Sequence, residues 1–386
     1  MPAELKTTVD AETRQAKGRI PLADPDADFR NLRADILAAM ARVLDSGSYI
    51  LGREVAEFER RIAARVGTAG AVGVASGTDA LVLALLAAGV SPGDEVISVS
   101  HTAGPTVAAI RMAGAVPVLI DVESKTLCLD PDALESAIGP RVRAVLPVHL
   151  YGCPADMERI CAIADRAGIA VIEDCAQAQE AAVSGRQVGS IGVAGCFSFY
   201  PTKNLGAVGD GGLVAASASE IVERARQLRT YGWTRPQFAE LPDGRCSRLD
   251  ELQAAILNVK LAHLAEAVER RRAIAQHYNS AFSDLPLVLP HEPAGRRHVY
   301  HLYVVRCDRR DALAQHLNQA GISTGIHYPY PVHAQPGIGS GARIPGPLRV
   351  TEMLSREILT LPLYPGMSPS ARDAVIDSVR AFFGKA

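Results

Sequence analysis

The sequence predicts an α/β protein with a mainly parallel central sheet flanked by helices, and a smaller C-terminal α+β domain. Two observations carry this prediction. From about residue 71, short β-rich runs alternate with helical stretches, a spacing that is typical of βαβ units and a parallel sheet. From residue 287 onward the alternation stops and one strand is followed by further helices. With 386 residues, the chain is long enough for two structural lobes.

The elements before and within the sheet follow from periodicity and turn residues. Residues 1–30 are polar and punctuated by prolines, so we expect a loosely packed arm that folds back on the second lobe. Helical periodicity covers 31–44 and 53–66. The expected strands are Val72–Ser76, Glu95–Ser100, Val116–Val122, Val142–His149, Ala170–Asp174, Gly195–Tyr200 and Gly212–Ala215. The expected helices are Asp79–Ala88, Pro105–Ala113, Pro131–Ile138, Met157–Ala167 and Ser219–Leu228.

The pattern changes after residue 247. Ser247-Arg248-Leu249-Asp250 has the sequence of a capping box, which predicts a long helix to about Ser283. Beyond it we expect a strand at His301–Cys307 and helices at Arg310–Ala320 and Ser370–Phe383. The predicted division is therefore an N-terminal arm (1–30), a large domain (31–250), a long connecting helix (251–286) and a small C-terminal domain (287–386).

Composition excludes several functional classes. The 40 basic and 42 acidic residues nearly balance, and no basic block stands out, so nucleic acid and membrane are not expected partners. The apolar run at 80–90 is too short to span a bilayer, and residues 1–17 lack the apolar core of a signal peptide. Seven cysteines are scattered without a C-x-x-C pair, which predicts reduced thiols in a cytoplasmic protein and no metal site.

Lys203 is the first candidate for chemistry. It follows a short apolar strand and precedes a glycine-rich turn. Burial at such a place would lower the pKa of the amine and make it a usable nucleophile. A lysine of this kind can form a Schiff base with an aldehyde cofactor such as pyridoxal phosphate (PLP). Taken alone, the position also fits an ordinary surface lysine.

Two other strand ends carry candidate residues. Gly77 and Thr78 join a strand to a helix, where backbone N–H groups and the helix dipole can bind a phosphate; a plain capping turn is the alternative. Asp174 ends an apolar strand, where α/β folds place ligands. It could keep a pyridinium nitrogen protonated, or simply be a solvated terminus. The neighbouring Glu173 would then face solvent or a helix.

In combination these motifs resemble the DegT/DnrJ/StrS family of PLP-dependent sugar aminotransferases. A phosphate turn, a strand-end aspartate about a hundred residues later and Ser-x-x-x-x-Lys about thirty residues beyond it follow the layout of fold-type I PLP enzymes. The resemblance covers nearly the whole chain, from about Ile20 to Phe383. It implies the fold of the aspartate aminotransferase-like transferases, with PLP as cofactor. The blocks that carry it are Ser76-Gly77-Thr78-Asp79-Ala80-Leu81, Gly93-Asp94-Glu95-Val96-Ile97, Glu173-Asp174-Cys175-Ala176-Gln177 and Ser198-Phe199-Tyr200-Pro201-Thr202-Lys203-Asn204.

The resemblance also implies roles for individual residues. Lys203 matches the lysine that forms the Schiff base and shuttles protons, and Asp174 matches the pyridinium partner. Gln177 would lie near the ring. The phosphate-binding positions match Gly77, Thr78 and Ser198. Family members are homodimers with shared active sites, and Arg248 matches a region that reaches the neighbouring subunit's phosphate.

The substrate side is expected in the segment 325–333. His327, Tyr328 and His333 are candidates for contacts with the sugar or its nucleotide diphosphate, and a role in the core of the second lobe is the alternative. Two positions depart from the family pattern. Cys246 stands where many relatives have asparagine, and Ala103 stands where many have an aromatic residue that stacks on the ring. Either a smaller residue covers the ring or the nearby His101 takes part.

The implied reaction is a transamination. L-glutamate is the expected amino donor and a nucleotide-linked keto-deoxysugar the acceptor, with a 3-amino product favoured over a 4-amino product. Lys203 favours this activity over related dehydratases, in which histidine replaces the lysine. The alternatives are another fold-type I PLP enzyme, such as a sugar dehydratase or an amino-acid lyase, and a non-catalytic regulator with the same fold.

Overall fold

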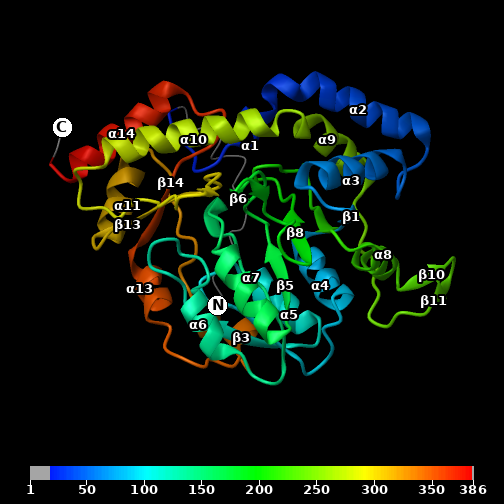
Figure 1. The fold of residues 1–386 in the computed structure, drawn as a ribbon. Coiled ribbons are helices and arrows are strands. Elements are labelled where there is room, and N and C mark those ends of the chain that lie inside the picture. Colours follow the sequence, from blue (N-terminus) through cyan, green and yellow to red (C-terminus); the bar gives the residue numbers. More distant parts are fainter. Residues whose placement is uncertain (1–17, 385–386) are drawn as a thin grey trace, which may run out of the picture.

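The computed structural model describes residues 18–384, and its centre is a seven-stranded sheet (Figure 1). The strand order is β1-β9-β8-β5-β4-β2-β3. The strands from β8 to β3 are parallel, whereas β9 is antiparallel to both β8 and β1. The mainly parallel sheet is therefore confirmed. The strands are β1 Gly70–Val74, β2 Glu95–Val99, β3 Val116–Ile120, β4 Val142–Val145, β5 Ala170–Asp174, β8 Ala194–Ser198 and β9 Gly212–Ala216.

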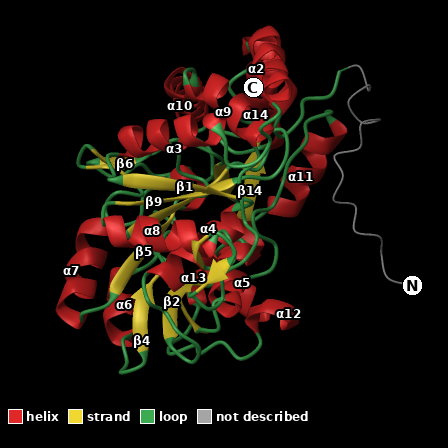
Figure 2. Cartoon of the chain, turned by 90° about the vertical axis from the view of Figure 1, so that its right-hand side faces the viewer, coloured by secondary structure: helices red, strands yellow, loops and turns green. Residues whose placement is uncertain are grey.

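Helices cover both faces of this sheet. Side chains alternate along each strand, so neighbouring residues contribute to opposite cores; Ala71 and Val72 of β1 illustrate this. One core contains α4, α5 and α8, and the other contains α3, α6, α7 and α9. Figure 2 shows α3 above β1 and β9, with α4 and α8 below them. The helices are α2 Arg33–Ser46, α3 Arg53–Val66, α4 Gly77–Ala87, α5 Gly104–Met112, α6 Pro131–Ala137, α7 Met157–Ala167, α8 Ser219–Leu228 and α9 Glu251–Leu261.

The C-terminal part has its own hydrophobic cluster. It contains a two-stranded antiparallel sheet of β13 Tyr303–Arg306 and β14 Ile358–Leu361. This arrangement is consistent with a small α+β domain, although the domain boundaries stay a prediction. Sequence analysis did not identify β14 or the helix before it. The helices here are α10 Leu264–Ala281, α11 Arg310–Gln319, α12 Pro336–Gly339, α13 Arg349–Glu357 and α14 Pro369–Phe382.

Short elements complete the fold. A three-stranded sheet in the order β12-β6-β7 joins the C-terminal part to a hairpin after β5. A second hairpin, β10–β11, extends away from α8 (Figure 1). These strands are β6 Ala182–Val183, β7 Arg186–Gln187, β10 Trp233–Arg235, β11 Phe238–Ala239 and β12 Arg296–Arg297. No helix among residues 18–384 has the length and apolar composition that a membrane crossing requires.

The described part of the N-terminal arm lies against the C-terminal part, as expected. The Ile20 N–H donates to the Gly321 carbonyl at 2.9 Å, and the Ser323 N–H donates to the Ile20 carbonyl at 2.9 Å. A short helix, α1 Pro25–Phe29, follows. Residues 1–17 of the predicted arm lie outside the described residues.

Two expectations for the connecting region were wrong. Ser247 does not cap a helix, because its hydroxyl accepts from the Ala75 N–H at 3.1 Å and donates to Asp79 at 2.8 Å. The expected single helix is instead two, α9 and α10, separated at residues 262–263. Tertiary contacts here override the local sequence pattern. Glu251 is a further example, because its carboxylate caps α3 by accepting from the Gly52 and Val55 N–H groups at 2.8 and 2.9 Å.

Candidate active site

Residues from the ends of three strands line one cavity. Gly77 and Thr78 follow β1, Asp174 ends β5, and Ser198 ends β8 with Lys203 five residues beyond. Because β1, β5 and β8 run in the same direction, these ends meet at one edge of the sheet, where α/β folds bind ligands. The cavity has a volume of about 220 Å³. Its walls include six predicted site residues, namely Gly77, Thr78, Asp174, Gln177, Ser198 and Lys203.

The Lys203 amine is tuned by two opposing effects. Burial lowers its pKa to about 8, and the nearby Asp174 carboxylate opposes this shift. A lowered pKa increases the fraction of neutral amine near neutral pH. The turn that places Lys203 is closed by its own N–H, which donates to the Tyr200 carbonyl at 2.8 Å. The geometry therefore supports a nucleophilic lysine rather than a surface one.

Asp174 is buried and held by two donors. The Thr106 hydroxyl donates to Oδ2 at 2.8 Å and the Ala176 N–H donates to Oδ1 at 3.1 Å. Burial raises the pKa of Asp174, while these donors and Lys203 act in the opposite direction. Sequence analysis missed Thr106. The only sequence feature that could have indicated Thr106 is its place in the first turn of α5. That turn lies near the end of β5, where Asp174 stands.

The turn between β1 and α4 approaches the end of β8 very closely. The Ser76 hydroxyl caps α4 by accepting from the Asp79 N–H at 3.1 Å. A Cβ added at Gly77 would lie 2.6 Å from the Ser198 Cβ. One added at Gly212 would lie 2.2 Å from the Ser76 carbonyl oxygen. Glycine at these positions brings the N-terminus of α4 and the Ser198 side chain to one wall, which suits an anion.

A second cavity of about 240 Å³ shares Gln177, Tyr200 and Lys203 with the first. Lys203 thus belongs to the walls of both. His327 and Tyr328 line the second cavity, as the substrate-side prediction requires. Its other walls come from the arm, the loop after β8, α10 and the C-terminal part, and they include Leu22, Ala23, Thr202, Arg271, His301, Leu302, Leu361 and Leu363.

Gln177 connects the walls of the two cavities. Its Oε1 accepts from the Tyr151 N–H at 2.7 Å, and its Nε2 donates to the Tyr328 hydroxyl at 3.0 Å. Burial raises the pKa of Tyr328 to about 12 and lowers that of His327 to about 4. Both side chains are therefore neutral at physiological pH. The His327 Nδ1 lies 2.8 Å from the Thr360 hydroxyl.

Two predicted residues line neither cavity. The His333 Nδ1 lies 2.7 Å from the Ser100 hydroxyl, behind the loop that leads to α5. The Arg248 guanidinium contacts the Cys246 sulfur at 2.9 Å, so its predicted role depends on a neighbouring subunit.

Ala103 does line the first cavity. His101 is buried beside it and contacts the Tyr151 hydroxyl at 2.9 Å.

A model of the DegT/DnrJ/EryC1/StrS aminotransferase family matches residues 30–380. The chain belongs to this family. The erythromycin biosynthesis sensory transduction protein EryC1 of Saccharopolyspora erythraea is 47% identical over 363 residues, which cover 94% of this chain and 99% of that protein. The dTDP-3-amino-3,4,6-trideoxy-alpha-D-glucose transaminase of Streptomyces venezuelae is 46% identical over 369 residues, 95% of this chain and 97% of that enzyme.

A solved structure agrees with these relatives. The crystal structure of Streptomyces venezuelae DesV in complex with a ketimine intermediate superposes with a TM-score of 0.92 at 45% identity, covering 95% of this chain and 99% of that one. The resemblance and the fold of PLP-dependent aminotransferases are both confirmed. The protein is an aminotransferase.

A buried polar cluster in this aminotransferase has a structural explanation. Ligand-type atoms of His149, Glu173 and Cys175 lie within 4.8 Å of one another. Glu173 was expected to face solvent or a helix, but it is fully buried. Its carboxylate accepts from His149 at 3.1 Å and at 2.8 Å from the N–H groups of Gly189, Ile191 and Gly192. These bonds stabilise the loop before β8, so we assign the cluster to the fold.

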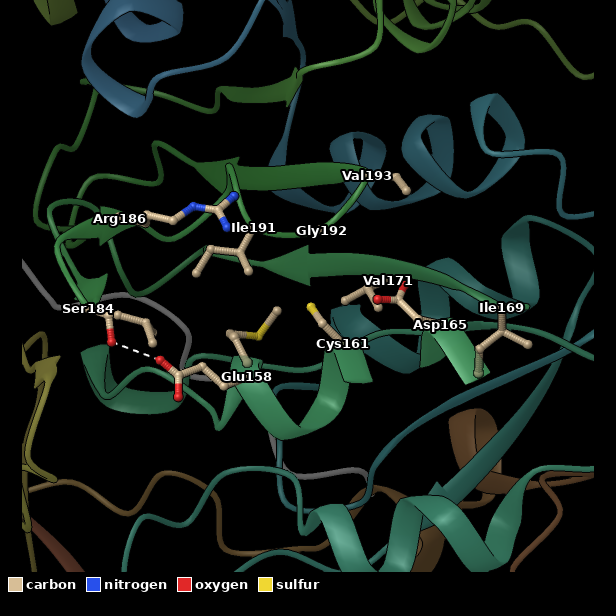
Figure 3. A pocket seen from close by; sticks show the side chains of 12 residues that line it. Glu158, Cys161, Asp165, Ile169, Val171, Ser184, Arg186, Ile191, Gly192 and Val193 are labelled. Atoms are coloured by element: carbon tan, nitrogen blue, oxygen red, sulfur yellow. Dashed lines mark hydrogen bonds between the residues drawn. The ribbon is translucent and has the colours of Figure 1, made fainter. Parts of the chain in front are cut away.

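Another pocket of the aminotransferase lies between α7 and the loop before β8 (Figure 3). Its volume is about 420 Å³. Figure 3 shows Glu158 pointing to Ser184, and the Ser184 hydroxyl donates to it at 2.8 Å. Burial raises the pKa of Cys161 in this pocket to about 11, so the thiol is protonated. Neither Lys203 nor Asp174 lines it, and the candidate active site is the pair of cavities around Lys203.

Proposed function

We propose that this aminotransferase transfers an amino group to the keto carbon at position 3 of a nucleotide-linked keto-deoxysugar. PLP is the proposed cofactor and L-glutamate the proposed amino donor. The observation that carries the proposal is the position of Lys203, which shares one cavity with Asp174 and a second with His327 and Tyr328. The name of the Streptomyces venezuelae relative specifies a 3-amino sugar, which supports position 3.

The first cavity fits PLP in its donor chemistry. It offers a helix N-terminus and hydroxyls for a phosphate, a buried carboxylate for a pyridinium nitrogen, and a lysine with a lowered pKa for an aldehyde. The close approach at Gly77, where a Cβ would meet Ser198 at 2.6 Å, keeps that wall narrow. When bound, PLP supplies an electron sink for the negative charge that develops at the substrate carbon.

The chain's own residues then have distinct roles. Gly77, Thr78 and Ser198 would bind the phosphate, and Asp174 would hold the ring nitrogen in its charged form. Gln177 would lie near the ring. The Lys203 amine moves a proton at the carbon that exchanges its amino group, because its lowered pKa suits both uptake and release of that proton.

The substrate side is formed by His327 and Tyr328. Both are neutral, so they can bind sugar hydroxyls through hydrogen bonds without attracting a counterion. We propose that His333 supports the site indirectly: it contacts Ser100 at 2.7 Å, and Ser100 precedes the loop whose Thr102 and Ala103 line the first cavity. The Gln177 bond to Tyr328 holds that phenol in the wall of the cavity that also contains Lys203.

We further propose a homodimer in which Arg248 of one subunit completes the phosphate site of the other. Large apolar side chains that are exposed in the single chain support this, namely Leu37, Leu44, Tyr49, Ile50, Tyr200, Val208, Tyr231 and Phe238. The seven cysteines are free thiols, which supports a reducing compartment such as the cytoplasm.

The test uses the purified protein with PLP and compares three forms. We expect a yellow wild type, loss of the visible band in Lys203→Ala, and retention in the control Lys125→Ala, whose lysine is exposed and remote from both cavities. Glutamate alone should convert the cofactor to its amine form. Incubation with 3-keto and 4-keto nucleotide sugars should then give an amino sugar, detected by mass spectrometry, from the 3-keto substrates.

Each part of the proposal can fail separately. A colourless wild type at saturating PLP rejects the role of Lys203. An unchanged spectrum with both glutamate and glutamine rejects the donor. A deoxygenated sugar product would favour a dehydratase. The relative from Saccharopolyspora erythraea is named a sensory transduction protein, and an absence of turnover with every keto-sugar would favour such a regulatory role.

A further inference from the structure

We propose that Tyr151 is a positioning residue, whose hydroxyl ties the loop beside the cofactor cavity to the substrate-side loop at His327. The inference deepens the proposed function and rests on it. Tyr151 lines neither cavity itself. It lies after β4 in a short 3-10 turn, Leu150–Gly152, and is buried.

Three contacts place Tyr151 at the junction of the two cavities. Its hydroxyl lies 2.9 Å from the His101 Nε2 and donates to the carbonyl oxygen of His327. Its backbone N–H donates to the Gln177 Oε1 at 2.7 Å. His101 is followed by Thr102 and Ala103, which line the cofactor cavity. The Tyr151 side chain therefore contacts two segments: the loop that begins at His101 and lines the first cavity, and the segment at His327 that lines the second.

The direction of these hydrogen bonds follows from proton counting. The His327 carbonyl can only accept, so it takes the single phenolic proton of Tyr151. The Tyr151 oxygen must then accept from His101, which fixes the proton of that ring on Nε2. Burial lowers the pKa of His101 to about 4 and raises that of Tyr151 well above its usual value. Both groups stay neutral at physiological pH, and the bond pattern is maintained.

The backbone at Tyr151 is also unusual. Its φ of 59° lies in the left-handed region, which non-glycine residues rarely adopt and which is often found near functional sites. The next residue, Gly152, has a φ of 93°, and a Cβ there would lie 2.7 Å from the Val299 side chain. The tight turn points the phenol inward between the two loops. This placement is expected of a positioning residue rather than of a residue that only fills the core.

The test compares Tyr151→Phe with Tyr303→Phe. Tyr303 is also fully buried, and its hydroxyl donates to the Asn279 Oδ1 at 2.7 Å. Each variant therefore removes one buried tyrosine hydroxyl, which makes two hydrogen bonds in Tyr151 and one in Tyr303. In Tyr151→Phe the KM for the keto-sugar should rise about tenfold, with kcat changed less, because a buried carbonyl loses its donor and the loop loosens. Amide hydrogen exchange in residues 325–330 should accelerate in Tyr151→Phe alone. Tyr303→Phe should leave KM and this exchange near wild-type values.

Equal effects of both variants on KM and on exchange would overturn the proposal, because they would show a purely structural role. The exchange measurement needs no substrate. An enzyme that turns over no keto-sugar would therefore reject the proposed function. Faster exchange at 325–330 in Tyr151→Phe would still support the positioning role of Tyr151. Should Tyr151→Phe not fold, His101→Ala removes the other partner of the hydroxyl and is expected to loosen the same segment; unchanged exchange there would equally count against the role of Tyr151.

Discussion

The balance of burial and charge at Lys203 leads to a pH prediction. Burial lowers the pKa from 10.5 to about 8, so about a tenth of the amine is neutral at pH 7. The neutral form attacks an aldehyde, and capture of PLP by the apoprotein should therefore speed up as pH rises through about 8. The rate can be followed by borohydride reduction and mass spectrometry of the peptide that contains Lys203.

The exposed Lys125 provides the internal control for this experiment. Its modification should rise only near the pH of an ordinary lysine. A midpoint near 10.5 for Lys203 as well would contradict the lowered pKa. The same shift also affects the stability of the apoprotein: between pH 8 and 10.5 the unfolded chain binds more protons at Lys203 than the folded chain, so this residue should make stability rise with pH.

Gly77 leads to a second residue-scale prediction. In Gly77→Ala the new Cβ would lie 2.6 Å from the Ser198 Cβ, and the turn must move by a few tenths of an ångström or more. Such overpacking costs about 1–3 kcal/mol, so affinity for PLP should fall about tenfold or more in an absorbance titration. Gly139→Ala is the matched control, because a Cβ there meets nothing within 4 Å. Equal affinities for the two variants would show that the close approach is not required.

Short motifs at strand ends led to the site residues that the sequence predicts. Lys203, Asp174 and Gly77 line one cavity, because a parallel sheet brings such strand ends to one edge; their roles there stay predictions. Thr106 and Tyr151 were missed. Thr106 reaches Asp174 across 68 positions, and Tyr151 reaches His327 across 176. No local pattern marks a residue whose partners come from distant segments.

Among the structural elements, the N-terminal arm is the one whose contribution to the site was least expected. Leu22 and Ala23 line the cavity that contains Lys203 and Tyr328. The arm is held there because the Leu363 N–H donates to the Leu22 carbonyl at 3.4 Å and Ile20 pairs with Ile322. A polar, proline-punctuated segment predicts an arm, but its register depends on residues 321–323 and Leu363, which lie far away in the sequence and which no local pattern reveals.

This placement predicts that Ala23 limits the size of the substrate. Ala23→Leu adds three carbon atoms to the wall of a cavity of about 240 Å³, so KM for the nucleotide sugar should rise about tenfold. The effect on glutamate should be smaller because glutamate is the smaller substrate. The control Ala167→Leu lies on the exposed side of α7 and should change neither value. The wall assignment is wrong if Ala23→Leu alters both substrates equally or not at all.

At the scale of the whole molecule, the outer face of α2 carries large apolar side chains that are exposed in the single chain. The buried side of α2 packs on α9 through Ala39, Val43 and Ala255, yet Leu37 and Leu44 of the same helix are exposed. The sequence alone could not distinguish this second apolar face from a wide core-facing stripe, because helical periodicity gives the angle between side chains and not the layer that each one meets. Only the fold shows that these leucines remain uncovered in a single chain.

If a homodimer covers this face of α2, charged residues introduced there should weaken the association of the subunits. Leu37 and Leu44 are 53% and 58% exposed, so Leu37→Glu combined with Leu44→Glu should not unfold a single subunit. Carboxylates buried without partners would instead oppose association, and light scattering after gel filtration should show a shift from dimer to monomer. Loss of the partner's Arg248 should then weaken PLP binding. The control Val288→Glu, at a side chain 51% exposed in the C-terminal part, should remain dimeric. A double variant that keeps the wild-type mass would place the subunit interface elsewhere, whereas a monomer with unchanged PLP affinity would reject the shared phosphate site.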